Sequence, residues 1–465
     1  GGYVFTANKE INGLTMGAVG SGTVIDYVQC SFINDDSFEW FGGKVNCSHL
    51  IAYKGTDDDF DTDFGYSGNV QFALSLRDPQ LFDPTYAAAS GASTSEGFES
   101  DNDANSSTLT PKTKAIFSNV TIIGPYRGSL TNAVGAGGTG AGFKRAARIR
   151  RNSELKIFNS ILMDFGTGLH IDGVTTEANA TNGLLKFKNN ILSGYFSSKG
   201  QVGEVNSGST FDIKTFIKNN NNDTVPLTAG ILINPYALDD NNSDFRPGTL
   251  ASSGASFTDP AFSGLVLSSY INKVEYRGAF APAPSPMWTS GWTEYNPQTK
   301  AYGTANVNVD GITVGTVVGS DVHITTNTTF TSNNIYLLKG AVYVDSLVTL
   351  TIEPGTVIRG DNIVANSSLI IRRGAKLLAE GTPCNPIVFT SNKVAGSRLP
   401  GDWGGIILLG RGSVNQTGGV SNIEGLTIAN QTQFGGGSTP NDADTSGILK
   451  YVRIEYAGYA YQPDN

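Results

Sequence analysis

The chain of 465 residues contains 57 glycines and only 16% charged residues, which excludes a coiled coil or helical bundle, because these need Ala, Leu, Glu and Lys at helical spacing. Its 39% apolar and 10% aromatic residues supply a hydrophobic core and exclude general disorder. A net charge of −9 would repel phosphate backbones, so we expect no nucleic-acid partner, and no apolar run reaches the ~18 residues of a membrane span.

The three cysteines, Cys30, Cys47 and Cys384, lack CxxC spacing. Their odd number and their spacing argue against a zinc site and against a disulfide scaffold. The chain opens with GGYVF, without a basic segment followed by an apolar one. We therefore expect either that a signal peptide has been removed or that the natural start lies elsewhere.

Short runs that alternate apolar and polar residues, separated by Gly, Asn and Asp, predict β-strands along the chain. Residues that favour strands fill these runs, which cover 24–32, 116–123, 157–163, 186–192, 348–352, 405–409 and 448–456. No segment keeps apolar residues at helical spacing over three turns, so we expect an all-β protein.

An internal repeat is the strongest feature of the sequence. Residues 28–39 (VQCSFINDDSFE) and 50–61 (LIAYKGTDDDFD) align at an offset of 22 residues, so that Asp35, Asp36 and Phe38 match Asp57, Asp58 and Phe60. The Phe–acid pair then recurs as Phe98–Glu99, after an inserted loop at about 78–96. Phe143–Lys144, after a Gly-rich loop at 133–142, and Leu169–His170 are the expected fourth and fifth copies.

A repeat of this length, built from short strands, predicts a parallel β-helix with inserted loops, in which each coil is one turn of a solenoid. A sandwich or barrel is the alternative, since its strands also recur every ~8–12 residues, but neither explains Phe–acid pairs in register. Asn tolerates left-handed corners, where we expect Asn119, Asn159, Asn189 and Asn190. The predicted core contains Val28, Phe38, Leu50, Phe60, Phe98, Val120, Ile161, Ile191, Ile352, Ile407 and Val452.

Several long motifs carry a resemblance to a known family. The stretch 326–361 (TNTTFTSNNIYLLKGAVYVDSLVTLTIEPGTVIRGD) resembles the opening coils of a family of secreted, mostly uncharacterised bacterial right-handed β-helix proteins. The segments 401–412, 449–465, 10–29 and 57–79 are similar to its middle coils, and 275–280 with 287–296 to its C-terminal end. The resemblance implies a right-handed parallel β-helix and export from the cell.

The order of these segments differs from that of the family, because the C-terminal signature here precedes the opening coils. The chain therefore reads as a circular permutation with a junction near Lys300 and Ala301. We expect middle and C-terminal coils over residues 1–280, a Pro-rich linker with the family terminus over 281–320, and opening coils over 321–465.

The linker suggests two alternatives for assembly. APAPSP at 281–286 cannot form a central strand, and it separates the coils from an aromatic group of Trp288, Trp292 and Tyr295. The tryptophans either cap an open end of the solenoid or reach a neighbouring subunit. In the second case the contact is head to tail, and the protein grows into a filament or another homo-oligomer.

Acidic residues gather in the first two copies of the repeat. Stacking would crowd like charges, and a cation with all-oxygen ligands, such as Ca²⁺, would relieve the repulsion. The alternative is turn chemistry, in which Asp accepts backbone N–H groups at corners. The candidate calcium ligands are Asp35, Asp36, Asp57, Asp58, Asp59, Asp61 and Asp63.

The residue after each repeated aromatic should point outward, which predicts a column of Glu39, Asp61, Glu99, Lys144 and His170. Polysaccharide lyases on β-helices combine Ca²⁺ with a basic residue, and Lys144, Arg145 and His170 are the candidate catalytic residues for such chemistry. The alternative is a purely structural ladder of opposite charges, which the sequence favours.

These observations favour an extracellular structural or adhesive β-helix on the cell surface, a self-assembling surface or filament subunit. The alternative is a Ca²⁺-dependent lyase-like or carbohydrate-binding β-helix with a surface polysaccharide as partner. The sequence leaves enzymatic activity open and favours a non-catalytic role.

Overall fold

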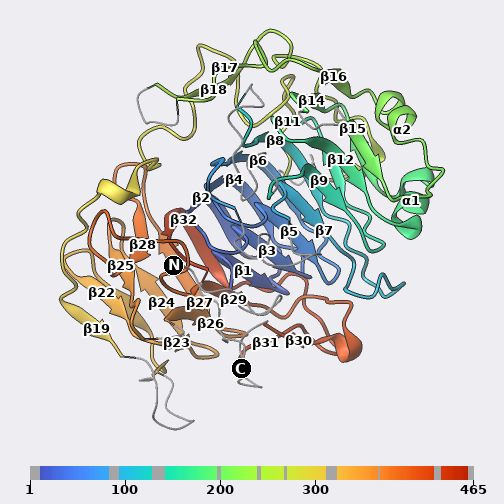
Figure 1. The fold of residues 1–465 in the computed structure, drawn as a ribbon. Helices are drawn as coiled ribbons and strands as arrows, with labels where there is room; N and C mark the ends of the chain where they lie inside the picture. The colour runs from blue at the N-terminus through green and yellow to red at the C-terminus, as the bar shows by residue number, and fades with distance from the viewer. Residues whose placement is uncertain are drawn as a thin grey trace.

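The computed structural model describes residues 11–82, 94–127, 142–195, 201–237, 242–265, 270–310, 322–364, 367–423 and 431–458. Nearly all regular structure in it is β-strand, and most strands pair in parallel with the equivalent strand of the next coil. Neither helix within these ranges has the length and apolar character needed to cross a bilayer. The predicted parallel β-helix is confirmed, and Figure 1 shows its coils stacked along the molecule.

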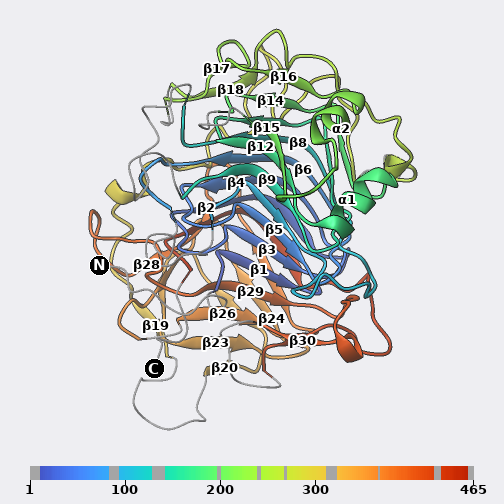
Figure 2. The same cartoon turned by 45° about the vertical axis from the view of Figure 1, so that its right-hand side comes forward.

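One short strand from each coil forms an eleven-stranded parallel sheet, which Figure 2 shows stacked from β20 to β15. In spatial order its members are β20 (Val322–Ile324), β23 (Ala341–Val344), β26 (Ser368–Ile371), β29 (Gly405–Leu409), β1 (Leu14–Gly17), β3 (Phe38–Phe41), β5 (Phe60–Asp63), β7 (Phe98–Ser100), β9 (Arg145–Ile149), β12 (Thr167–Ile171) and β15 (Gln201–Val205).

The remaining sides of the solenoid come from a second set of parallel strands. These are β19 (Val307–Val309), β21 (Thr328–Phe330), β22 (Ile335–Leu338), β24 (Thr349–Ile352), β25 (Val357–Gly360), β27 (Lys376–Glu380), β28 (Ile387–Ser391), β32 (Gly447–Glu455), β2 (Val24–Ser31), β4 (Asn46–Tyr53), β6 (Asn69–Leu76), β8 (Ile116–Ile123), β10 (Lys156–Phe158), β11 (Ile161–Met163), β13 (Lys186–Lys188), β14 (Ile191–Ser193) and β16 (Asp223–Val225).

Short elements complete the described fold. They are the helices α1 (Val174–Thr181) and α2 (Ile213–Asn219), the 3₁₀ turns η3 (Pro260–Phe262), η4 (Pro297–Thr299) and η5 (Thr417–Gly419), and the antiparallel pairs β17 (Leu232–Asn234) with β18 (Asp244–Pro247) and β30 (Ser421–Asn422) with β31 (Gln433–Phe434).

A left-handed residue bends the chain at the same corner of successive coils. Tyr27, in the middle of the long strand β2, has φ +55°, and Asn119, Asn159 and Asn189 have φ +55°, +54° and +58°. Asn adopts this conformation at low cost, so the corner expected for these three asparagines is confirmed. Asn190 instead follows the corner, where its amide donates to the Ile157 carbonyl and accepts from the backbone N–H of Ser160.

The interior is a ladder of like residues from successive coils. Phe38 and Phe60 stack with ring centroids 5.8 Å apart, and Phe98 continues the ladder 5.5 Å from Phe60. The interior also contains the other predicted core residues Val28, Leu50, Val120, Ile352 and Val452. The in-register stacking expected from the 22-residue offset is therefore confirmed.

Three of the predicted core residues lie on the outside of the coils, and the prediction of an inward orientation was wrong for them. Ile161 and Ile191 belong to a lateral apolar cluster, and Ile407 belongs to another beneath Phe434. All three are nonetheless fully buried, because distant segments cover them. Alternation alone cannot reveal this, since a covered outer face is as apolar as the core.

The segment that contains the aromatic linker residues covers one side of the solenoid. Trp292 and Tyr295 pack in one cluster with Ile51, Leu74 and other outward residues of the middle coils. The Tyr53 hydroxyl donates to the Tyr295 carbonyl at 2.9 Å. Trp288 lies on the same side, and its ring centroid is 5.1 Å from that of His49 in β4. The tryptophans therefore do not cap an end of the solenoid, and that expectation was wrong.

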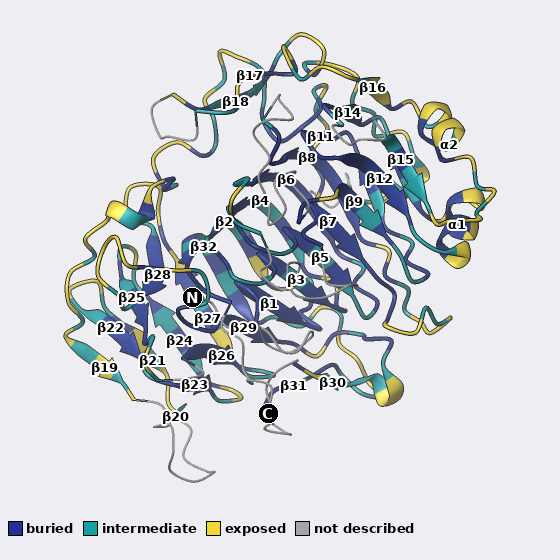
Figure 3. Ribbon diagram, viewed as in Figure 1, coloured by how far each residue is buried: buried dark blue, intermediate teal, exposed yellow. Residues whose placement is uncertain are grey.

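One end of the stack is closed by a helix that the sequence analysis did not predict. Ile213 and Ile217 of α2 join the interior cluster next to β15, and α1 contributes Ala180. Figure 3 shows the opposite sides of both helices exposed. These helices shield the apolar interior of the last coil from water. A solenoid needs such a cap, because its terminal coil has no further coil to cover it.

The first and last described coils of the chain are neighbours in the middle of the stack. β1 pairs with β29 and β3, and β2 pairs with β32 and β4, all in parallel. In spatial order the stack thus begins with β19 and β20, passes through β29 and β32, and continues with β1 and β2. The permuted order relative to the family and the division at residues 280 and 320 stay predictions.

The phenylalanine ladder predicts a large stability cost for its truncation. Phe60→Ala should lower the free energy of unfolding by about 3–5 kcal/mol, because it opens a cavity between two coils. Leu227, which is 70% exposed, provides the control Leu227→Ala. Equal denaturant midpoints for the two variants would contradict the stacked interior.

Candidate functional site

A row of charged side chains crosses the outer face of the eleven-stranded sheet. The strand register places Glu39 beside Asp61, Asp61 beside Glu99, Glu99 beside Arg148, and Arg148 beside His170. Adjacent strands lie about 4.8 Å apart, so the row brings together charges from distant parts of the sequence. Glu204 of β15 extends it past His170.

The fourth position of this row corrects the sequence analysis. Arg148 stands where Lys144 was expected, because Ala147 and not Phe143 pairs with Phe98. Phe143 instead forms an isolated bridge with Ser95, and Lys144 lies exposed before β9. The Gly-rich insertion shifted the apparent repeat. The alternation Ala147, Arg148, Ile149, Arg150 was the signal that could have revealed the true register.

A second acidic series lies in the loops that precede the sheet strands. The Asp36 carboxylate accepts the backbone N–H of Asp58 at 2.9 Å, and the Asp58 carboxylate accepts that of Glu96 at 2.5 Å. Glu96 accepts the backbone N–H of Arg145 at 2.7 Å. Each carboxylate thus ties one coil to the next, which is the turn chemistry weighed for these residues.

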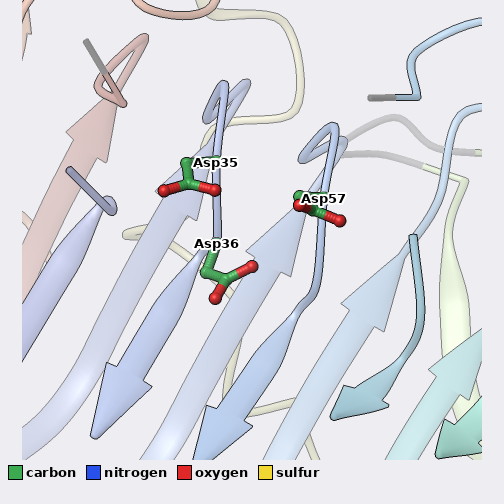
Figure 4. Close-up of side chains that lie close together, drawn as sticks. All are labelled: Asp35, Asp36 and Asp57. Atoms are coloured by element: carbon green, nitrogen blue, oxygen red, sulfur yellow. The ribbon is translucent and has the colours of Figure 1, made fainter. Parts of the chain in front are cut away.

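Two groups of three carboxylates come within metal-binding reach. Ligand oxygens of Asp35, Asp36 and Asp57 lie within 4.8 Å of one another, and so do those of Asp36, Glu39 and Asp61. Figure 4 shows Asp35 and Asp36 on one coil and Asp57 on the next. Asp36 is common to both groups, and carboxylate oxygens are among the ligands that Ca²⁺ prefers.

The environment of the second group opposes its negative charge. Burial, followed by the neighbouring carboxylates, raises the pKa of Asp36 well above its ordinary value. Burial and Glu99 raise the pKa of Asp61 likewise. Among the described residues, Asp61 Oδ1 and Asn12 Oδ1 are buried without a hydrogen-bond partner, and the Asn12 amide contacts Glu39. A bound cation would satisfy these oxygens and hold the carboxyls ionised.

The other predicted ligands lie outside these two groups. The Asp59 carboxylate forms a fully buried ion pair with Arg77 at 3.0 Å and also contacts Ser75. The Asp63 carboxylate accepts the backbone N–H of Phe64 at 2.6 Å, and Asp58 belongs to the loop series above. The seven aspartates therefore divide between turn chemistry, an internal ion pair and the candidate metal groups.

Arginines compensate the charge in the middle of the row. Arg148 pairs with Asp172 at 2.7 Å and with Glu99 at 3.6 Å, and Arg150 pairs with Asp101 at 2.7 Å and with Glu99. Burial nevertheless raises the pKa of Glu99 to about 7, although both guanidinium groups oppose the shift. Opposite charges on neighbouring coils therefore do pair in this part of the row, as the predicted salt ladder requires. Arg148 and Arg150 supply the positive charges in place of Lys144.

Two further candidates, Arg145 and His170, come from the neighbouring strands β9 and β12. Arg145 bridges Glu96 at 3.0 Å and Glu204 at 2.9 Å. His170 is 3% exposed, and its Nε2 lies 3.0 Å from Asn206 Oδ1. Burial, followed by the charge of Arg145, lowers the pKa of His170. The imidazole is therefore neutral at neutral pH, with Nδ1 unpaired within the described part of the chain.

The shifted carboxyl of Glu99 predicts how stability depends on pH. Its pKa in the folded chain, about 7, exceeds the ordinary 4.5, so folding takes up a proton between these values and stability falls as pH rises through this window. Between pH 4.5 and 7 the free energy of unfolding should decline by an amount on the order of 1–3 kcal/mol. Glu99→Gln should remove this decline. Urea unfolding at several pH values measures it, with the exposed Glu380→Gln as control. An unchanged slope in Glu99→Gln would contradict the shift.

The comparisons with known proteins agree with this architecture. A family model described as a pectate-lyase like beta helix domain matches residues 1–231 and 322–465. A comparison with curated proteins gives no match, and neither does a comparison with solved structures.

Proposed function

Because the chain belongs to the family of pectate-lyase-like β-helix domains, we propose that it is a carbohydrate-binding β-helix. In this proposal it binds an acidic polysaccharide, through Ca²⁺, on the outer face of the eleven-stranded sheet. The observation that carries the proposal is the group of Asp36, Glu39 and Asp61, with ligand oxygens within 4.8 Å of one another.

The chemistry of the ligand follows from the charges on this face. The carboxylates alone would repel an anionic polymer. A Ca²⁺ ion held by Asp36, Glu39 and Asp61 would bridge the face to such a polymer, because Ca²⁺ takes six to eight oxygen ligands and three side chains leave positions open. A uronate carboxylate is the complementary sugar group. Such polymers lie outside cells, so the proposal includes an extracellular location.

The geometry favours binding over a lyase reaction. Elimination needs a base next to the sugar carbon whose carboxylate the cation neutralises. His170 is three strands, or about 14 Å, from Asp61, which is farther than one sugar residue spans. The pKa of Arg150, the basic residue whose charge acts on Asp61, is raised, so Arg150 stays protonated. Neither residue is suited to remove a proton from a uronate bound at this group.

The adhesive or filament role has no comparable observation in its favour. Trp292 and Tyr295, which were expected to mediate assembly, pack on coils of their own chain. Head-to-tail assembly stays a prediction, and the polysaccharide-binding proposal does not depend on it.

Calcium binding by the acidic group predicts a thermal shift. Ca²⁺ at a hundredfold excess over its dissociation constant should stabilise the protein by about 2.7 kcal/mol, and chelator should reverse this. Asp61→Asn should remove most of the effect. Asp310→Asn, at a side chain 76% exposed, is the matched control. If Ca²⁺ raised the melting temperature equally in both variants, the ion would bind elsewhere and the proposed site would be overturned.

Polysaccharide binding is tested by calorimetry with polygalacturonate in calcium and in chelator. Binding should require calcium, disappear in Asp61→Asn, and be absent for a neutral glucan. The same samples should form no unsaturated uronate. Formation of that product, and its loss in His170→Ala, would replace the binding proposal with a lyase.

A further inference from the structure

A cleft of about 530 Å³ lies at the carboxyl ends of β23, β26 and β29, away from the acidic row. It is lined by residues within two positions of these strand ends: Ser346, Arg372, Arg373 and Arg411. The opposite wall comes from the loop after β31, which contributes Thr439 and Asn441. The apolar cluster beneath Phe434 holds β31 against the sheet, so this wall has a fixed support.

Among the described residues, only one of the three arginines is paired with an acid. Arg372 pairs with Asp345 at 2.7 Å. Arg373 donates to two neutral oxygens, the Gly435 carbonyl at 2.8 Å and Gln433 Oε1 at 2.6 Å. The structure shows no partner for the Arg411 guanidinium within the described ranges, and Asp444 accepts only the backbone N–H of Arg411, at 2.9 Å. The lining residues within the described part of the chain include no carboxylate.

The turn at Gly374 keeps these cations close together. Gly374 has φ +81°, and a Cβ there would lie 2.8 Å from Arg411 Nη2 and 3.0 Å from Ser346 Oγ. The Arg411 guanidinium therefore packs over this turn, beside the Ser346 hydroxyl. Burial lowers the pKa of Arg373, and the charges of Arg411 and Arg372 lower it further, as expected where like charges share a partly buried site.

We propose that this cleft binds an oxyanion group, a carboxylate, sulfate or phosphate, carried by a small molecule or a sugar residue. The forked guanidinium groups of Arg373 and Arg411 match the paired oxygens of such a group. The hydroxyl groups of Ser346 and Thr439 can donate to its remaining oxygens. The volume lies within the range of about 300–1,000 Å³ for small-ligand pockets, so it holds more than a bare ion.

This site differs from the acidic face in its chemistry and needs no calcium. Its existence does not depend on the polysaccharide proposal. Arg411→Gln is the direct variant, because the substitution removes no side-chain hydrogen bond that the structure shows in the described ranges. Arg246, paired with Asp244 at 2.6 Å, provides the control Arg246→Gln.

Calorimetry with sulfate, phosphate and glucuronate, each in chelator, tests the proposal, with glucose as the neutral control. At least one anion should bind to the unmodified protein. Its affinity should fall about tenfold or more in Arg411→Gln and should be unchanged in Arg246→Gln and Asp61→Asn. Binding of sulfate and phosphate alone identifies a tetrahedral group, whereas binding of glucuronate identifies a carboxylate.

Crystals soaked in selenate provide a second measurement that needs no variant. An anomalous peak between Arg373 and Arg411 supports the site. Absence of binding by every anion, or full affinity in a folded Arg411→Gln, would each overturn the proposal. Absence of the selenate peak would also overturn it where sulfate or phosphate binds in solution.

Discussion

The structure depends on one constraint, the parallel hydrogen bonding of each coil to the equivalent residues of the next. This register places like residues about 4.8 Å apart along the solenoid. Inside, it stacks Phe38, Phe60 and Phe98. Outside, the same register sets Glu39 beside Asp61 and Asp61 beside Glu99. The interactions that stabilise the core and those that crowd the acids therefore share one cause.

Crowded acids need compensation, and the chain supplies it differently along the row. Backbone N–H groups of the next coil compensate Asp36 and Asp58 in part. Arginines compensate Glu99. At Asp61 one carboxylate oxygen remains buried and unpaired among the described residues, which is why the proposed cation belongs there.

The part of the architecture that follows from local repetition could be predicted from the sequence. The 22-residue offset predicted the Phe38–Phe60 stack, and asparagines before β runs predicted the left-handed corners. Prediction failed where the repeat is interrupted. The insertion before β9 displaced the expected Lys144 from the row, which Arg148 occupies instead. It also failed where distant segments meet, since no local pattern shows that Ile161 is covered from outside.

The central claim is that in-register stacking of two neighbouring coils builds a cation site from Asp36 and Glu39 of one coil and Asp61 of the next. A crystal structure of the protein grown with Tb³⁺, which replaces Ca²⁺ and scatters anomalously, tests it most directly. The account predicts a strong peak coordinated by Asp36, Glu39 and Asp61, with Phe38 and Phe60 stacked beneath. A structure with that register intact and no metal at these carboxylates would contradict it.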